Sequence, residues 1–199
     1  MCPLFETVRI AEGIPLHLSW HQRRMDMARN EYWPGNHPIA LHDLLVVPAE
    51  FSTGIVHCNI RYGAAINDIT FSPYSGKIIR SLKIVYADLA DYHVKFMDRT
   101  FLETLLSMKG DCDEILIVKN GLITDTSMSN IIFYNGTAWF TPEKPLLKGT
   151  CRERLLAEGS IEEMDIHTDD LCNFTCCQLI NAMRFPEETE TIGISNIIA

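Results

Sequence analysis

Lys95 is the residue of this sequence whose surroundings best suit covalent chemistry. It lies in the run Tyr-His-Val-Lys-Phe-Met, an apolar setting. Desolvation lowers the pKa of a lysine, and the unprotonated amine is the form that attacks a carbonyl carbon. The pattern alone is weak evidence, because a lysine near a strand end is usually a solvated surface residue.

Two downstream segments carry groups that could bind a charged ligand. Gly149 precedes Thr150 and Cys151 at an expected helix start, and a helix N-terminus offers free backbone N–H groups to a phosphate. Asp125 precedes small residues and an apolar strand, where its carboxylate could pair with a protonated ring nitrogen. The plainer alternatives are an ordinary helix start and a polar loop between hairpin strands.

The elements of the first half indicate helices packed on an antiparallel sheet. We expect a turn at Glu12-Gly13, a cap at Ser19 for the first helix and a cap at Asp98 for a later one. The strands are expected at 5–9, 55–62, 65–71 and 78–87, and the helical segments at 20–31, 40–46 and 99–108.

The second half is rich in strands. Asn120-Gly121 and Asn135-Gly136 each follow an apolar run and predict antiparallel hairpins, which favours a barrel-like lobe. Thr150 and Glu153 fit a capping box that opens a helix through Glu158. Strands are expected at 114–118, 129–134, 137–141 and 161–166, with a helical turn at 168–171 and further segments at 178–183 and 191–198.

These elements predict an α+β fold of two lobes. The N-terminal α+β lobe is expected to span residues 1–90, and the C-terminal barrel-like lobe residues 91–199. Ligand clefts commonly occur between two lobes of a protein, so we expect a cofactor to bind there.

Composition excludes several other classes of protein. The net charge is −9 and no run of Lys and Arg exists, whereas a nucleic-acid surface is basic. No stretch approaches the roughly 18 apolar residues of a membrane span, and the N-terminus does not resemble a secretion signal. The seven cysteines are odd in number and no secretion signal is visible, so we expect reduced thiols in a cytoplasmic protein. No CxxC pair exists, so we expect no metal site.

Taken in order, these segments resemble the fold-type-IV pyridoxal-phosphate (PLP) enzymes, the class IV aminotransferase family. The resemblance runs from about residue 4 to about residue 183. Its motifs are Phe5-Glu-Thr-Val-Arg9, His21-Gln-Arg-Arg24, Lys95-Phe-Met-Asp-Arg99, Asp113-Glu-Ile-Leu, Gly121-Leu-Ile-Thr-Asp125, Ser129-Asn-Ile-Ile-Phe133, Thr141-Pro142 and Gly149-Thr-Cys-Arg152. This series is specific as a set, and it implies the two-lobed fold of D-amino-acid aminotransferases.

The resemblance assigns five residues to the PLP cofactor. Lys95 matches the lysine that holds the cofactor covalently and then moves protons at the substrate Cα. Asp125 matches the carboxylate that faces the pyridine nitrogen, and Arg24 the arginine that binds the cofactor phosphate. Thr150 and Cys151 match the two residues whose backbone holds that phosphate.

Four further residues match positions of the family, the first two less securely. Asn181 corresponds to another polar contact of the phosphate, and Arg61 to a strand arginine that can meet a substrate carboxylate. Arg152 and Asn130 belong to the motifs, but for these two a structural role in capping or loop bonding is the simpler interpretation.

Two features depart from the family pattern. The family has glutamate where Asp125 stands, and aspartate is one methylene shorter, so its contact with the ring requires a shifted backbone or a bridging water, or is not made. The chain also begins close to the first strand, so we expect a trimmed N-terminal α/β sandwich.

The residues within the motifs favour an aminodeoxychorismate lyase. Lys95-Phe-Met-Asp98-Arg99 resembles the lyases' lysine followed by Asn-Arg, and Asn181-Ala182 resembles their Cys-Asn-Ala. The reaction would convert 4-amino-4-deoxychorismate to 4-aminobenzoate and pyruvate, a step toward folate. The alternatives are an amino-acid aminotransferase of branched-chain or D-amino-acid type and a degenerate PLP-binding protein. The resemblance also implies a homodimer acting on a small-molecule amine.

Overall fold

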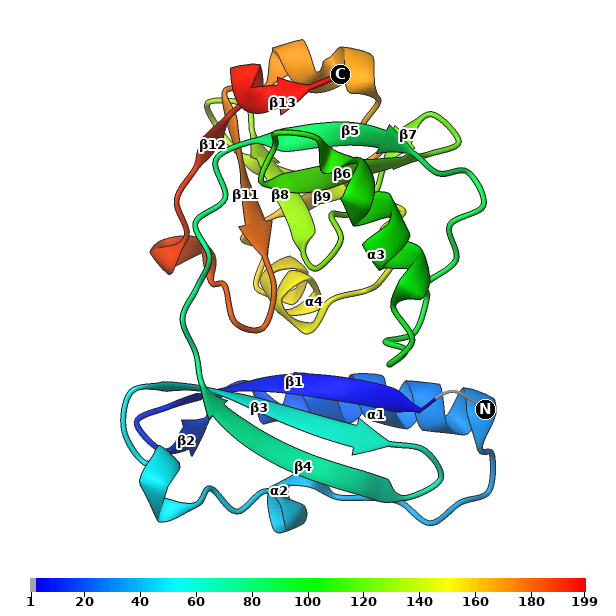
Figure 1. Ribbon diagram of the computed structural model, residues 1–199, viewed down its shortest axis with the longest axis vertical. Coiled ribbons are helices and arrows are strands. Elements are labelled where there is room, and N and C mark those ends of the chain that lie inside the picture. The colour runs from blue at the N-terminus through cyan, green and yellow to red at the C-terminus, as the bar shows by residue number, and fades with distance from the viewer. Residues whose placement is uncertain (1–2) are drawn as a thin grey trace. The chain divides into compact units, whose positions relative to one another are not determined.

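The computed structural model describes residues 3–199 and divides the chain into two compact units (Figure 1). The first unit extends to Gly76 and includes Val94–Asp98, while the second comprises Lys77–His93 and Arg99–Ala199. This division differs from the expected boundary near residue 90. The reason is a long-range contact, since residues 4 and 96 form an antiparallel bridge that attaches the Lys95 segment to the first unit.

The first unit is a four-stranded antiparallel sheet with order β2-β1-β3-β4. Its elements are β1 (Leu4–Ala11), β2 (Ile14–Pro15), α1 (Leu18–Tyr32), α2 (Leu41–Leu44), a 3-10 turn (Ala49–Phe51), β3 (Ile55–Tyr62) and β4 (Ile66–Pro73).

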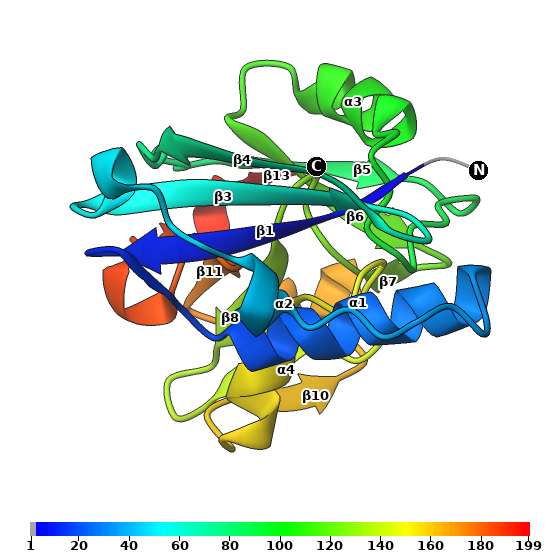
Figure 2. The same cartoon turned by 90° about the horizontal axis from the view of Figure 1, so that it is seen from below.

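Helix α1 covers one face of this sheet (Figure 2). Its Met25 and Ala28 pack in one buried cluster with Val8 of β1 and with Val56 and Ile60 of β3. Alternate residues of a strand point to opposite faces, so Phe5, Thr7 and Arg9 belong to the face away from α1.

The expected N-terminal caps of helix α1 and of the later helix α3 (Thr100–Leu106) were wrong by two residues and by one residue. The first residue outside α1 is His17, with a left-handed backbone (φ 53°), so Ser19 lies inside the helix. Helix α3 begins after Arg99 rather than Asp98. Neither helix start has a side-chain cap, so these polar residues do not mark where the helices begin.

The second unit contains two sheets, with orders β10-β9-β8-β11-β12 and β13-β5-β6-β7. Its strands are β5 (Leu82–Tyr86), β6 (Glu114–Lys119), β7 (Leu122–Ile123), β8 (Asn130–Tyr134), β9 (Trp139–Pro142), β10 (Glu162–Met164), β11 (Cys176–Ile180), β12 (Ile192–Gly193) and β13 (Ile197–Ile198). Besides α3, the unit has helix α4 (Thr150–Ala157) and 3-10 turns at Ser107–Lys109, Thr168–Asn173, Pro186–Glu188 and Ile194–Asn196.

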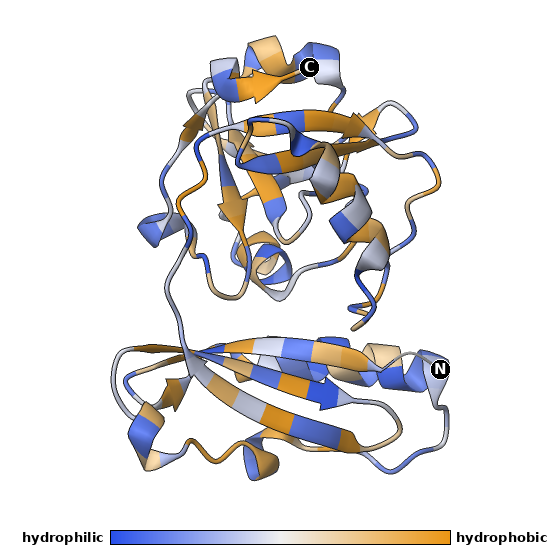
Figure 3. Cartoon of the chain, in the orientation of Figure 1, coloured by the Kyte–Doolittle hydropathy of each residue, from blue (hydrophilic) through white to orange (hydrophobic). Residues whose placement is uncertain are grey.

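The core of the second unit lies between its two sheets. Leu82 and Leu116 of one sheet share a buried cluster with Ile131, Phe133 and Leu179 of the other, and Figure 3 shows these strands largely in the hydrophobic colour. The barrel-like lobe and both Asn-Gly hairpins, β6–β7 and β8–β9, are therefore confirmed. The sheets also contain parallel pairs, β5–β6, β13–β5 and β9–β10, which the hairpin signals did not predict.

Several features of the described residues bear on function. Within residues 3–199, no group of three or more His, Cys, Asp or Glu side chains is arranged to hold a metal ion. No helix of this part of the chain is long and apolar enough to cross a membrane. The described cysteines are free thiols, and Cys2 lies outside the described residues.

Candidate active site

Backbone hydrogen bonds in the first unit fix Lys95 against the edge of strand β1. The Phe5 N–H donates to the Lys95 carbonyl over 3.0 Å, and the Met97 N–H donates to the Pro3 carbonyl over 2.8 Å. These bonds extend the sheet by a short segment that comes from much later in the chain. The position of Lys95 is therefore set by the sheet and not by a flexible loop.

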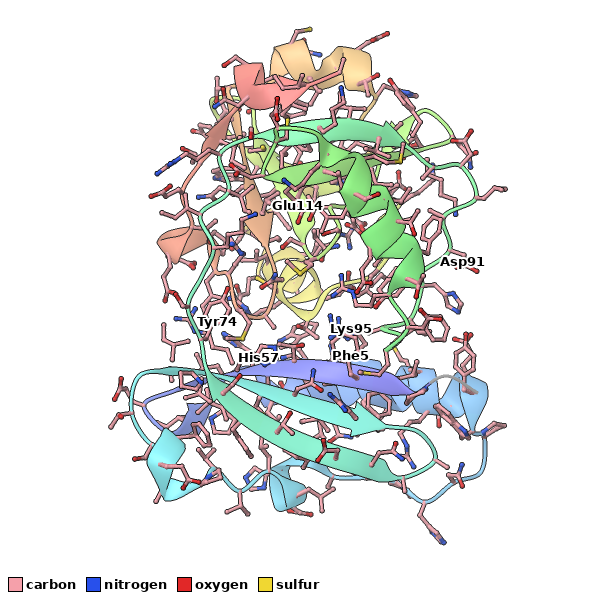
Figure 4. All side chains as sticks on the ribbon, in the orientation of Figure 1. Phe5, His57, Tyr74, Asp91, Lys95 and Glu114 are labelled. Carbon is pink, nitrogen blue, oxygen red and sulfur yellow. The ribbon has the colours of Figure 1, made fainter. Side chains whose placement is uncertain are left out.

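The amine of Lys95 lies over an aromatic ring. Its Nζ is 4.4 Å from the centroid of the Phe5 ring, within the range of a cation–π contact (Figure 4). Burial and then the charge of Lys95 lower the pKa of His57. Burial, offset in part by Glu6, also lowers the pKa of His21, with a smaller contribution from Lys95.

Arg61 lies on the same sheet face as this lysine's aromatic partner. In the register of β1 and β3, Arg61 is directly opposite Phe5, so the two side chains project side by side. Arg61 is exposed. The structure therefore places a cationic group close to Phe5, while its contact with a substrate stays a prediction.

Arg24 of α1 forms a buried ion pair with Glu6 of β1. The Nε of Arg24 donates to Glu6 Oε1 over 2.9 Å, and Nη2 donates to Oε2 over 2.6 Å. The same Oε2 lies 2.6 Å from Nδ1 of His21. Glu6 is fully buried, whereas the Arg24 side chain is 15% exposed.

The charge of Arg24 decides the ionisation of Glu6. Burial alone would raise the pKa of the carboxyl, but the positive charge of Arg24 and hydrogen bonds from His21 and Arg24 outweigh it and lower the pKa to about 2. Glu6 is thus an anion at neutral pH, and His21 must donate its Nδ1–H to it.

In the second unit, Asp125 is a buried carboxylate held by neutral donors. The side-chain amide of Asn130 donates to Oδ1 over 2.7 Å, and the backbone N–H of Leu147 donates to Oδ2 over 2.9 Å. Burial raises the pKa of Asp125 to about 6, although hydrogen bonds from Leu147 and Asn130 and the charge of Arg152 lower it. The carboxyl is therefore ionised mainly above pH 6.

Asn130 joins Asp125 to the segment that leads into helix α4. Its Nδ2 donates to the Leu147 carbonyl over 2.8 Å as well as to Asp125. A Cβ at Gly149 would lie 2.0 Å from Asn130 Oδ1, so only glycine fits at this position. The motif residues Asn130 and Gly149 thus have a defined packing relation, consistent with the structural interpretation of Asn130.

The start of helix α4 has the properties of an anion site. The first helical bond runs from Glu153 N–H to the Gly149 carbonyl, so the N–H groups of Thr150 and Cys151 have no acceptor inside the helix. Both residues are buried, and no side chain caps this end. The expected capping box at Thr150 was wrong, because Thr150 is already helical and Gly149 precedes it.

Arg152 has a structural role in the same helix. It is fully buried and donates to the Pro142 carbonyl and to the carboxylates of Glu153 and Glu163. Arg152 therefore anchors α4 to strands β9 and β10 and fixes the direction in which the helix start points.

Asn181 follows strand β11 and is held by its neighbours. Its Nδ2 donates to Ser129 Oγ over 2.9 Å, and its Oδ1 accepts the Met183 N–H over 2.8 Å. This contact connects the end of β11 to the turn before β8. A phosphate contact by Asn181 stays a prediction.

Sequence reasoning missed a second buried carboxylate in this unit. Glu114 of β6 accepts a hydrogen bond from Ser127 Oγ over 2.9 Å and one from the Ile115 N–H over 2.8 Å. Arg99 donates to the Ser127 carbonyl. The network steadies the loop after Asp125, and its one visible signal is a glutamate that opens an otherwise apolar strand.

Each unit thus gathers part of the expected site. The first unit places Arg61 and Lys95 around Phe5 and orders Arg24. The second connects Asp125 to the approach to Thr150 and Cys151. The first set provides an amine that can act as nucleophile and base, and the second provides a buried acid and donors for an oxyanion.

Comparison with known proteins places this chain among enzymes of one family. Residues 93–185 match the family model "Amino-transferase class IV". An "Uncharacterized protein" of Haemophilus influenzae is 40% identical over 186 residues, which cover 92% of this chain and 98% of that protein.

Solved structures agree in fold. A "putative 4-amino-4-deoxychorismate lyase" from Haemophilus somnus has a TM-score of 0.88 and 36% identity, with 93% of this chain and 98% of that chain covered. The PLP-bound form of "a hypothetical aminotransferase" from Mycobacterium tuberculosis has a TM-score of 0.72 at 14% identity, over 96% of this chain and 80% of that one. Its likeness supports the fold alone. With full-length relatives at this level of identity, the chain is an enzyme of the class IV aminotransferase family.

Proposed function

We propose that this enzyme uses PLP to cleave 4-amino-4-deoxychorismate into 4-aminobenzoate and pyruvate. The observation that carries the proposal is the full-length relation, at 36% identity, to the Haemophilus somnus protein that bears the name of such a lyase. The run Lys95 to Arg99 supports the same choice, because it is similar to the lyase form of the motif.

The residues present fit the cofactor. The start of α4 is buried and lacks a side-chain cap, which suits the phosphate dianion of PLP. We expect Thr150, Cys151 and Arg24 to hold this phosphate, with a further contact from Asn181. Asp125 is the acid suited to the ring nitrogen, and Lys95 is the amine suited to the covalent link.

Lys95 is expected to move the proton in this reaction. When bound, PLP withdraws electrons from the substrate carbon that carries the amine. Nζ of Lys95 takes the proton from this carbon, and general base catalysis of this kind contributes about 10²–10⁴-fold. The electron pair of the broken C–H bond completes the aromatic ring as the C–O bond to the enolpyruvyl group breaks. The released enolpyruvate takes up a proton at its methylene carbon and becomes pyruvate, so no keto acid is needed as acceptor.

The aspartate in place of glutamate is compatible with this reaction. Asp125 shares its oxygens with Asn130 and Leu147, so we expect it to support a weaker electron sink than a glutamate that reaches the ring. Formation of the aromatic product supplies driving force that transamination lacks. Arg61 is expected to meet a carboxylate of the substrate.

An amino-acid aminotransferase is the second candidate, favoured by the family model that matches residues 93–185. Such an enzyme requires a keto acid to turn over, and it transfers the amino group of its substrate without eliminating pyruvate. A third candidate, a degenerate protein, binds PLP without turnover. We further expect a homodimer, as the resemblance implies, and a cytoplasmic location, as the expected reduced thiols indicate.

Pyruvate release from 4-amino-4-deoxychorismate, by the cofactor-loaded protein without keto acid, tests the proposal. We expect steady release by the wild type and a loss of about a thousandfold or more in Lys95→Ala, because the base and the covalent link are both removed. Lys144→Ala is the matched control, since this exposed lysine pairs with Asp165 and is expected to leave turnover unchanged. Release only after a keto acid is added would identify an aminotransferase. A loaded protein inactive with every amine and acceptor would be the degenerate form.

A further inference from the structure

The pair of Glu6 and Arg24 is unusual in where it lies. Glu6 is fully buried on the helix-facing side of β1, the side that also carries Leu4 and Val8 of the apolar core. Taking two charges out of water costs about as much as their attraction returns, so stability gives a poor account of an ion pair in this position.

The contacts of Glu6 fix both the position and the direction of the guanidinium. Nε and Nη2 of Arg24 each donate to one carboxylate oxygen, at 2.9 and 2.6 Å, so the planar fork is held along one side. The bond from His21 to Oε2 holds the carboxylate from the other direction. An arginine has five N–H donors in a planar fork, so a guanidinium can contact two oxyanions at once.

Preorganisation of this kind matters most for a long side chain. A free arginine loses rotamer entropy when it is ordered, and a ligand must otherwise supply this cost. Here α1 provides the backbone and Glu6 provides the direction, while 15% of the Arg24 side chain remains exposed. The arrangement is typical of a binding residue held ready by a buried partner.

We propose that Glu6 is a positioning residue, whose carboxylate, held by His21, orients the Arg24 guanidinium to bind the phosphate of PLP. This inference rests on the proposed function, in which Arg24 is a phosphate ligand. It goes further because it gives Glu6 and His21 a part in cofactor recognition, although neither is expected to touch the cofactor.

The test compares two forms of the cofactor that differ only in the phosphate. The full-length protein, freed of cofactor, is equilibrated with PLP or with pyridoxal, and the two Kd values are measured by dialysis. Their ratio reports phosphate recognition alone, because loss of fold or of Lys95 reactivity weakens both ligands together. The variants are Glu6→Gln, Glu6→Asp, Arg24→Gln and the double Glu6→Gln/Arg24→Gln.

We expect Arg24→Gln to reduce the preference for PLP by about thirtyfold, as loss of a charged hydrogen-bond donor implies. Glu6→Gln should reduce it by about tenfold, and Glu6→Asp, which keeps the charge but shortens the reach, by about threefold. The double variant should equal Arg24→Gln, because Glu6 acts through Arg24. Asp26→Asn is the matched control, since this carboxylate on the same helix bonds Gln22 and should leave the ratio unchanged.

Two results would overturn the inference, and they differ in meaning. If Arg24→Gln lowers the preference while both Glu6 variants keep it, Arg24 orients itself and Glu6 has no part in recognition. If Arg24→Gln keeps the preference, Arg24 does not bind the phosphate, and the cofactor assignment falls with the inference. Should Glu6→Gln fail to fold, Glu6→Asp decides. None of these measurements depends on pyruvate release, so failure of the lyase assay is a separate outcome.

Discussion

Glu6 in the first unit and Asp125 in the second are both buried carboxylates with hydrogen bonds to each oxygen, yet their pKa values move in opposite directions. That of Glu6 falls to about 2, and that of Asp125 rises to about 6. Burial raises the pKa in both cases. The difference lies in the donors, because Glu6 faces the guanidinium of Arg24, whereas Asp125 accepts bonds from neutral amides.

The contrast shows that a hydrogen-bonded cation keeps a buried acid fully ionised, whereas neutral donors together with the charge of Arg152 do not. It also separates two kinds of site. A carboxylate with a resident cation serves to orient that cation. A carboxylate with neutral donors only can accept a further positive partner, and a protonated ring nitrogen is such a partner.

The largest expected effect on stability comes from the first of these groups. Glu6→Gln should lower the free energy of unfolding at pH 7 by about 3 kcal/mol, because the Arg24 charge loses its counter-charge in a largely buried position. The folded pKa is depressed, so this stabilisation is present above the ordinary value of 4.5 and is lost as pH falls toward 2. Urea unfolding at pH 7 and at pH 3 should show a smaller deficit at the lower pH. An equal deficit at both would contradict the assigned pairing.

Asp125→Asn should show the opposite dependence on pH. The folded pKa of Asp125 is raised, so its stabilisation is present below about 3.8 and is lost as pH rises through about 6. Relative to the wild type, the cofactor-free variant should therefore gain about 2–3 kcal/mol between pH 4 and pH 7. Urea unfolding at these two pH values measures the change, and a constant difference would place the carboxyl in a less buried setting.

Gly149→Ala probes the connection between Asp125 and helix α4. The new Cβ would lie 2.0 Å from Asn130 Oδ1, so the amide must move and release its bonds to Asp125 and to the Leu147 carbonyl. We expect a loss of about 2 kcal/mol in thermal or urea unfolding. Gly76→Ala is the control, since its Cβ would meet only Tyr74 at an ordinary 3.6 Å. Equal stabilities for both variants would show that the loop yields without cost.

Asn181→Ala should have the smallest effect, about 1 kcal/mol, through loss of its bonds to Ser129 and Met183. The informative measurement is the affinity for PLP. A weaker affinity with unchanged pyridoxal binding would support the predicted phosphate contact. Unchanged affinity for both ligands would restrict Asn181 to its structural bonds.

Local signals in the sequence predicted much of the fold. The strand at residues 55–62 has the bounds observed for β3, and Asn120-Gly121 forms the predicted hairpin turn, with both residues in the left-handed region. Alternation and turn chemistry act over a few residues, so they are visible in the sequence alone. The caps at Ser19 and Thr150 were wrong because the start of a helix also depends on where the preceding strand or loop delivers the chain.

The parts that sequence reasoning could not supply depend on contacts between distant residues. The return of Lys95 to the edge of β1 requires pairing with Phe5, 90 positions earlier, and determines the division into two units. Glu6 appeared in a motif, but its role became visible only through Arg24 and His21. The motif residues Asn130 and Gly149 likewise became a packing relation only when their spacing was known.

Chemical trapping of the cofactor tests the central claim most directly, that Lys95 carries PLP in this enzyme. The loaded protein is reduced with borohydride and digested, and the peptides are examined by mass spectrometry. The account predicts the phosphopyridoxyl mass on the peptide that contains Lys95, and its absence from Lys95→Ala treated in parallel. The same mass on another lysine, or no modified peptide from protein that shows the absorbance of bound cofactor, would contradict it.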